Sequence, residues 1–185
     1  EAQTIHRLLE YTPSEGAFGR TAEKPLEAEL LVVDECSMVD TWLMAHLAAA
    51  LGPAARLVMV GDSHQLPSVG PGLVLQQAID SGAAQVAELT EIFRQRSGGL
   101  IVENAHRILG GRLPRLPEPG AAADFFLVEE QDPAKAADKV RRTVCERLPA
   151  AFGLDPVRQV QVLAPMHRGA LGCQRLNQML REELN

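Results

Sequence analysis

The chain has 185 residues, of which 46% are hydrophobic, and this is enough to bury a sizeable core. No run approaches 18 apolar residues, so the sequence contains no membrane span. Its net charge of −6 argues mildly against binding nucleic acid by bulk electrostatics, although a channel with local basic groups stays compatible with it. The three cysteines lack metal-ligand spacing, so we expect reduced thiols in a cytoplasmic protein.

Hydrophobic periodicity and breaker residues predict alternating helices and strands along the chain. In chain order we expect helix 4–11, strand 30–33, helix 41–50, strand 57–60, helix 73–79, strand 85–89, helix 100–109, strand 125–129, a helix from 133 to about 148, strand 160–164 and a helix ending at 184. Asp40 and Asp132 are suited to cap the helices that follow them, and Pro133 fits a first helical position. Such alternation implies a parallel sheet with helices on both faces.

The first candidate site follows the strand at 30–33. The four apolar residues Leu30–Val33 predict a strand buried on both faces, and Asp34 and Glu35 come directly after it. The carboxyl ends of parallel strands are where α/β sheets bind ligands. Asp34 is suited to hold a magnesium ion, directly or through water, and Glu35 to orient or deprotonate an attacking water. A strand followed by an ordinary acidic turn gives the same short pattern.

A second group of polar residues follows the strand at 57–60, in the run Gly61-Asp62-Ser63-His64-Gln65-Leu66-Pro67. Gly61 frees the backbone at the strand end, and Asp62 and Gln65 offer polar tips just beyond it. A glutamine side chain donates and accepts hydrogen bonds, which suits the sensing of phosphate or water. Together with the two upstream carboxylates, this turn favours a nucleotide site over an exposed polar turn.

These segments resemble, in family order, the motifs of RecD-like helicases of superfamily 1. Asp34-Glu35-Cys36-Ser37-Met38 resembles motif II, the run from Gly61 to Pro67 resembles motif III, and Leu89-Thr90-Glu91-Ile92-Phe93-Arg94-Gln95 resembles motif IV. The opening Thr4-Ile5-His6-Arg7-Leu8-Leu9 resembles the segment before motif II, and 162–169 with Leu176-Asn177 resembles a segment of the second motor domain. Each motif is short, but the ordered set spans nearly the whole chain.

The resemblance implies an α/β fold of two RecA-like P-loop NTPase motor domains, in which parallel sheets are flanked by helices. Residues 1–90 would form the C-terminal part of the first domain, and residues 91–185 the N-terminal part of the second. Residues 11–28 contain several turn formers around Phe18. In the family a small β-hairpin pin that splits the duplex occupies this interval, so we expect a hairpin with Phe18 near its tip. An ordinary surface loop fits the same residues.

The resemblance also implies roles for individual residues. ATP would bind between the two domains, with Mg²⁺ on Asp34 and with Glu35 activating water. Asp62 and Gln65 would face the nucleotide, and Gln65 would report the γ-phosphate to the DNA side. Arg94 would neutralise charge on the γ-phosphate in the transition state. Candidate contacts with DNA are Thr4, His6, Arg7, Phe18, His64, His167 and Arg168.

The chain departs from the family because it contains no Gly-Lys-Ser or Gly-Lys-Thr, the signature of a phosphate-binding loop. None of its three lysines, Lys24, Lys135 and Lys139, follows a glycine or precedes a serine or threonine. We therefore expect an internal piece of a longer motor that has no appreciable ATP turnover of its own.

The function implied by the resemblance is that of an ATP-dependent DNA helicase that moves 5′-to-3′ on single-stranded DNA in recombination and repair. Its partners would be single-stranded DNA, junctions of single and double strands, and other subunits of a helicase–nuclease complex such as exonuclease V. Two alternatives stay open. The helicase portion of a conjugative relaxase shares these motifs, and a remnant without a phosphate-binding loop would serve as a DNA-binding or assembly module.

Overall fold

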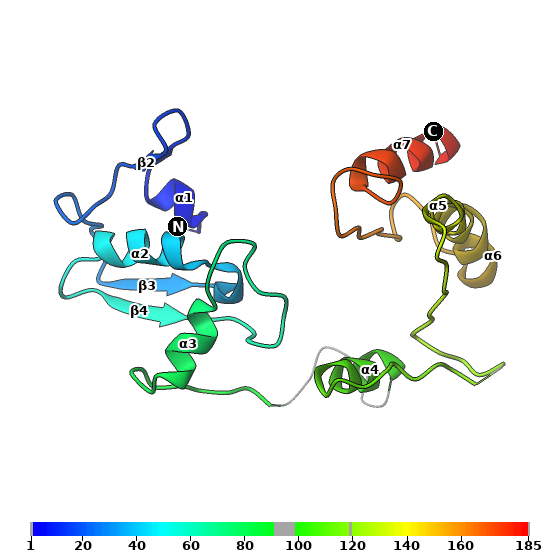
Figure 1. Ribbon diagram of the computed structural model, residues 1–185, viewed down its shortest axis with the longest axis horizontal. Helices are drawn as coiled ribbons and strands as arrows, with labels where there is room; N and C mark the ends of the chain where they lie inside the picture. Colours follow the sequence, from blue (N-terminus) through cyan, green and yellow to red (C-terminus); the bar gives the residue numbers. More distant parts are fainter. Residues whose placement is uncertain (1, 91–98, 119, 185) are drawn as a thin grey trace. The chain divides into compact units, whose positions relative to one another are not determined.

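The structure is a computed structural model that describes residues 2–90, 99–118 and 120–184. The chain divides into two compact units, residues 1–96 and 97–185, and each is described by itself (Figure 1). The domain boundary expected near residue 90 stays a prediction. Arg94 and most of the expected motif IV lie outside the described residues. Among the residues that are described, no helix has the length and apolar character needed to cross a membrane.

The first unit begins with a short helix and a hairpin. In chain order its elements are α1 (Ile5–Leu8), β1 (Tyr11–Thr12), β2 (Ala17–Phe18), β3 (Leu30–Val33), the 3₁₀ turn η1 (Cys36–Met38), α2 (Thr41–Ala50), β4 (Arg56–Met59) and α3 (Val74–Asp80). The expected helix 4–11 is real but ends early, because Glu10 has φ +57° and Tyr11 enters a strand. The Thr4 hydroxyl caps α1 by accepting a hydrogen bond from the Arg7 amide, 3.3 Å away.

The core of the first unit lies between α2 and one face of a two-stranded parallel sheet. β3 pairs with β4 in parallel, with Leu30 opposite Arg56 and Val33 opposite Met59. Asp40 caps α2 as expected, because its Oδ1 accepts a hydrogen bond from the Leu43 amide at 2.8 Å. The buried residues of this core are Leu9, Phe18, Leu26, Val33, Cys36, Val39, Leu47, Ala50 and Leu75.

The prediction that β3 is buried on both faces is wrong for the part of the chain that the structure describes. Val33 is 5% exposed, whereas Leu30 and Val32 are 56% and 55% exposed. Successive side chains of a strand point to opposite faces, so α2 covers one face only and the other remains open. The sheet is therefore parallel, as expected, but helices do not cover both of its faces.

The predicted hairpin forms, but Phe18 does not lie at its tip. β1 pairs with β2 in antiparallel register, with Tyr11 opposite Phe18 and Thr12 opposite Ala17. Residues 13–16 make the turn, in which Gly16 adopts φ +62°. Phe18 is only 9% exposed and belongs to the core cluster. Phe18, which we expected near the tip, is thus buried at the open end of the hairpin. Moving its apolar ring out of water lowers the free energy of the folded state.

The second unit is helical in the residues described. Its elements are α4 (Leu100–Leu109), α5 (Pro133–Arg142), the π-helical turn η2 (Thr143–Arg147), α6 (Leu148–Phe152) and α7 (Cys173–Leu184). Gly110 ends α4 as expected. Asp132 caps α5 by accepting hydrogen bonds from the Ala134 amide at 2.8 Å and the Lys135 amide at 3.3 Å. Local capping chemistry therefore fixes the start of α5.

Three expected strands are absent from the described structure. Segments 85–89, 125–129 and 160–164 adopt no regular strand, and they make no backbone–backbone hydrogen bond within the described residues. A strand exists only when a neighbour supplies the ladder of hydrogen bonds, whatever its own propensity. Several apolar side chains in these segments are exposed to water, and Leu163 is 85% exposed.

Candidate functional site

The ends of β3 and β4 bring the two candidate motifs together in the first unit. Because the strands run in parallel, the chain leaves both at the same edge of the sheet. The Val60 amide donates to the Val33 carbonyl at 2.8 Å, and the Cys36 amide donates to the Val60 carbonyl at 2.8 Å. These two bonds join the turn that carries the carboxylates to the start of the turn that carries Gln65.

The two carboxylates are exposed at this edge, in an unusual backbone conformation. The Asp34 Oδ1 accepts a hydrogen bond from the Glu35 amide at 2.9 Å. Asp34 receives no other hydrogen bond from the described residues, so its second oxygen is available to a ligand. Glu35 has φ +51°, a left-handed conformation that is uncommon for any residue except glycine. Backbone strain of this kind concentrates at functional sites.

The turn after β4 is organised by Asp62. Its Oδ1 accepts a hydrogen bond from the His64 amide at 2.9 Å, and its Oδ2 accepts one from the Gln65 Nε2 at 3.3 Å. The Gln65 amide also donates to the Asp62 carbonyl at 3.2 Å. All three side chains are exposed. Asp62 therefore shapes the turn, and Gln65 keeps its side-chain carbonyl for another partner.

Gly61 allows the two turns to pack closely. A Cβ added at Gly61 would lie 3.0 Å from each of the Cys36 nitrogen, the Ser37 nitrogen and the Leu75 Cδ2. The Cys36 thiol is fully buried here, and burial raises its pKa. The Ser37 hydroxyl is buried too, and it makes no hydrogen bond with the residues that the structure describes. This hydroxyl, two residues after Glu35 in the sequence, is therefore an unused donor and acceptor.

These residues fit a magnesium–nucleotide complex. No group of three or more histidine, cysteine, aspartate or glutamate side chains that could hold a metal lies within the described parts of the chain. Magnesium does not need such a group, because it keeps several waters and takes one or two carboxylates together with substrate phosphates. The exposed carboxylate of Asp34, with one oxygen left without a hydrogen bond, meets this requirement.

The candidate DNA contacts are divided between the units. His6 and Arg7 are exposed on α1, where Thr4 serves as the cap. The His64 Nδ1 lies 3.7 Å from the Asp62 Oδ1. His167 and Arg168 belong to the second unit and are exposed in the loop before α7. The remaining candidate, Phe18, is buried and cannot contact DNA without unfolding of its surroundings.

The first unit contains a cluster of aromatic rings that we did not predict from the sequence. This ring cluster consists of His6, Tyr11, Phe18, Trp42 and His46. The Trp42 and His46 rings come from adjacent turns of α2, with centroids 4.5 Å apart. Their spacing of four residues was the available signal, because residues four apart share a helix face.

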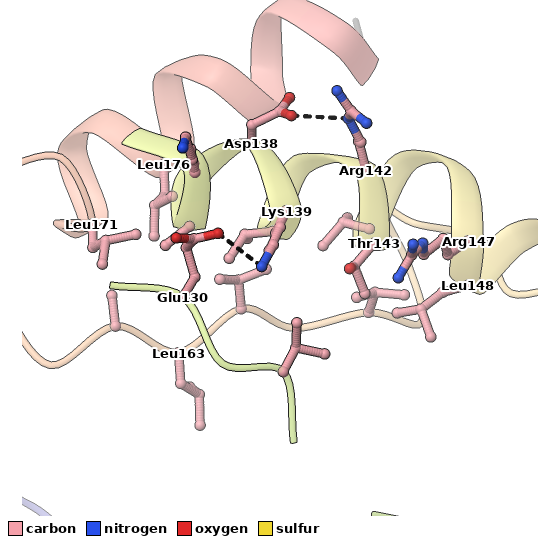
Figure 2. Close-up of a pocket in the computed structure, with 18 of the residues that line it drawn as sticks. Glu130, Asp138, Lys139, Arg142, Thr143, Arg147, Leu148, Leu163, Leu171 and Leu176 are labelled. Carbon is pink, nitrogen blue, oxygen red and sulfur yellow. Dashed lines mark ion pairs between the residues drawn. The ribbon is translucent and has the colours of Figure 1, made fainter. Parts of the chain in front are cut away.

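The second unit contains a pocket of about 810 Å³ beside α5, η2 and α6 (Figure 2). Its wall is mainly apolar, and two ion pairs lie along it. The Lys139 Nζ lies 2.8 Å from a Glu130 oxygen, and the Arg142 Nε lies 2.9 Å from an Asp138 oxygen. None of the site residues predicted from the sequence lines this pocket.

Comparisons with known proteins agree with the motifs. The chain is 38% identical over 185 residues to the ATP-dependent RecD2 DNA helicase of Deinococcus radiodurans, which covers all of this chain and 24% of that protein. It is 40% identical over 112 residues to the RecBCD enzyme subunit RecD of Mycobacterium tuberculosis, or 60% of this chain and 19% of that one. It is also 32% identical over 90 residues to DNA helicase B of Mus musculus, 46% of this chain and 8% of that one.

The chain thus spans about a quarter or less of the curated relatives it matches. The resemblance to RecD-like helicases is confirmed by these relatives. A family model described as an AAA domain matches residues 1–125, which is more than half of the chain, and the chain therefore belongs to this AAA domain family.

Proposed function

We propose that the chain is part of an ATP-dependent DNA helicase, and that the edge formed by the ends of β3 and β4 contributes to its ATP-hydrolysing site. The observation that carries this proposal is the parallel pairing of the two strands, which joins the Asp34–Glu35 turn to the Gln65 turn through two backbone hydrogen bonds. Ligands of α/β sheets bind at this edge. The similarity to a DNA helicase and to RecD subunits supports this helicase function. Translocation on single-stranded DNA in the 5′-to-3′ direction, in recombination and repair, is part of the proposal and follows from the resemblance of the motifs alone.

Each residue of the edge has a chemical task in this proposal. The bound magnesium ion would neutralise charge on the phosphates. Asp34 would hold that ion through the carboxylate oxygen that is left without a hydrogen bond. Glu35 would orient the attacking water and accept its proton. Gln65 would donate to the γ-phosphate through its Nε2, or accept from the attacking water through its side-chain carbonyl. Arg94, outside the described residues, would neutralise transition-state charge.

DNA binding would use the exposed basic and imidazole side chains of both units. The exposed side chains that would reach a phosphate or a base are His6, Arg7 and His64 in the first unit, and His167 and Arg168 in the second. Thr4 is less suited, because its hydroxyl already caps α1. Single-strand/double-strand junctions are the proposed substrate. The RecBCD names of several relatives support a helicase–nuclease complex as the assembly in which such a chain works.

The test is DNA-stimulated ATP hydrolysis by the full-length helicase, wild type beside Glu35→Gln and Glu27→Gln. Glu27 is an exposed glutamate of the same unit and lies outside the edge, so it controls for the loss of one negative charge. We expect Glu35→Gln to lower kcat by about 10²-fold or more, which is the usual size of a general-base contribution, and Glu27→Gln to leave it unchanged.

Equal activity of Glu35→Gln and the wild type would remove Glu35 from the chemistry. A wild type without any DNA-stimulated hydrolysis, but with DNA binding intact, would instead favour a binding or assembly module that retains the motor fold. The observation that favours a binding or assembly module is the absence of Gly-Lys-Ser and Gly-Lys-Thr from these residues.

A further inference from the structure

The ring cluster joins the hairpin to helix α2. Phe18, on the second strand of the hairpin, lies at its centre. The centroid of the Phe18 ring is 5.1 Å from that of Trp42 and 4.8 Å from that of His46, both on α2. It is also 5.0 Å from the Tyr11 ring on the opposite strand. These distances and the tilted ring planes lie in the range of favourable aromatic pairs.

The hairpin needs such support because it is very short. It has only the residue pairs Tyr11–Phe18 and Thr12–Ala17, and an isolated two-stranded hairpin is at best marginally stable in water. Its base is tied to the end of α1 by the Gly19 amide, which donates to the Glu10 carbonyl at 3.2 Å. Contact with α2 comes from the rings, so the rings fix the direction of the hairpin relative to that helix.

Helix α2 is itself tied to the candidate ATP-hydrolysing edge. It begins after η1, six residues beyond Glu35, and Asp40 caps it. The Thr41 amide donates to the Pro71 carbonyl at 3.0 Å, so the first turn of α2 is bonded to the segment that follows the Gln65 turn. A Cβ at Gly70 would collide with the Asp40 side chain, which shows how closely this segment packs against the start of α2.

We propose that Trp42 is a positioning residue that fixes the hairpin to α2, so that the hairpin and the carboxylate edge move as one body. The inference rests on the proposed helicase function and on the expectation, implied by the family resemblance, that the hairpin separates the strands. Trp42 suits this task because it contacts both strands of the hairpin. Its ring centroid lies 6.5 Å from that of Tyr11, edge-on, and 5.1 Å from that of Phe18. It is 43% exposed, so truncating it does not open a sealed cavity in the core.

The first measurement is the number of base pairs unwound per ATP hydrolysed on a forked duplex, in the full-length helicase. We compare Trp42→Ala, Trp42→Phe and Met44→Ala. Met44 lies on the same helix and packs against the core without belonging to the ring cluster. We expect Trp42→Ala to lower this ratio about fivefold or more while DNA-stimulated ATP hydrolysis stays within about twofold of wild type. Trp42→Phe keeps a ring and should restore the ratio, and Met44→Ala should not change it.

The second measurement is hydrogen exchange of the backbone amides of the same proteins, which does not depend on helicase activity. Trp42→Ala should speed exchange in the hairpin, residues 11–18, by about tenfold, and leave α3 unchanged. Unchanged exchange in the hairpin would overturn the proposal, and so would equal acceleration in the hairpin and α3. A parallel fall of ATP hydrolysis and unwinding, or an equal effect of Met44→Ala, would overturn it as well. A wild type that hydrolyses no ATP would refute the proposed function, while the exchange experiment would still decide the role of Trp42.

Discussion

Replacing Gly61 with alanine tests how closely the two turns of the candidate site are packed. The new methyl carbon would lie 3.0 Å from the Cys36 and Ser37 nitrogens and from the Leu75 Cδ2. Favourable contacts between heavy atoms lie at about 3.5–4.0 Å, so the neighbours must withdraw by about 0.5 Å. Cys36 cannot withdraw freely, because its amide is bonded to the Val60 carbonyl at 2.8 Å.

The magnitude follows from a comparison with Gly52→Ala. A Cβ at Gly52 would meet nothing within 4 Å. Both substitutions restrict the unfolded chain similarly, which by itself stabilises the folded state by about 0.4–1 kcal/mol. Overpacking costs about 1–3 kcal/mol, so the free energy of unfolding of Gly61→Ala should be lower than that of Gly52→Ala by about this amount.

The assay is urea unfolding of the chain, followed by the fluorescence of Trp42, which is its only tryptophan and lies in the first unit. We expect a lower urea midpoint for Gly61→Ala than for wild type, and a midpoint for Gly52→Ala equal to or above wild type. Equal midpoints for the two variants would refute the close approach of the two turns and, with it, the geometry proposed for the site.

Two further predictions concern single polar groups. Ser37→Ala removes a buried hydroxyl that has no hydrogen-bond partner among the described residues. We therefore expect this variant to have a free energy of unfolding about 1 kcal/mol higher than wild type, measured by urea unfolding. A lower free energy of unfolding would show that the hydroxyl is hydrogen-bonded. A hydrogen bond from Lys24, and to a lesser degree one from Arg20, lowers the pKa of the Glu10 carboxyl below its ordinary value of 4.5. The stability that these two bonds provide is complete above pH 4.5 and is lost as the pH falls through the lowered pKa. The urea midpoint should therefore fall less with decreasing pH in Glu10→Gln than in wild type. Identical pH profiles of the two proteins would contradict the two ion pairs.

Local chemistry made part of the fold predictable. Asp40 and Asp132 were recognised as caps because a carboxylate next to the first free amides of a helix acts within one turn. The carboxylates after β3 were located for the same reason, since a four-residue apolar run and the residues after it are neighbours in sequence. Which face of that strand is covered depends on elements far along the chain, and there the prediction was wrong.

Non-local contacts explain the remaining errors. The family resemblance, together with the turn formers, predicted the hairpin. The burial of Phe18 depends on rings that lie 24 and 28 residues further along, at Trp42 and His46. Segments 85–89, 125–129 and 160–164 have the composition of strands, yet composition does not supply a neighbouring strand. The roles of Asp34, Glu35 and Gln65 were predicted from their chemistry as well as from the ordered motifs, and the role of Arg94 from the motifs. All of them stay predictions until the variants are measured.

Because Cys36 is buried, the rate at which its thiol is chemically modified reports local opening of the structure around it. A thiol-modifying reagent needs the thiolate form and free access, and a raised pKa together with full burial denies it both. Modification of Cys36 can therefore proceed only in the moments when its turn lifts away from β4. The rate of Cys36 modification therefore measures how often the turn that carries Asp34 and Glu35 opens. Cys145 and Cys173 are half-buried in the second unit and report on a different part of the chain.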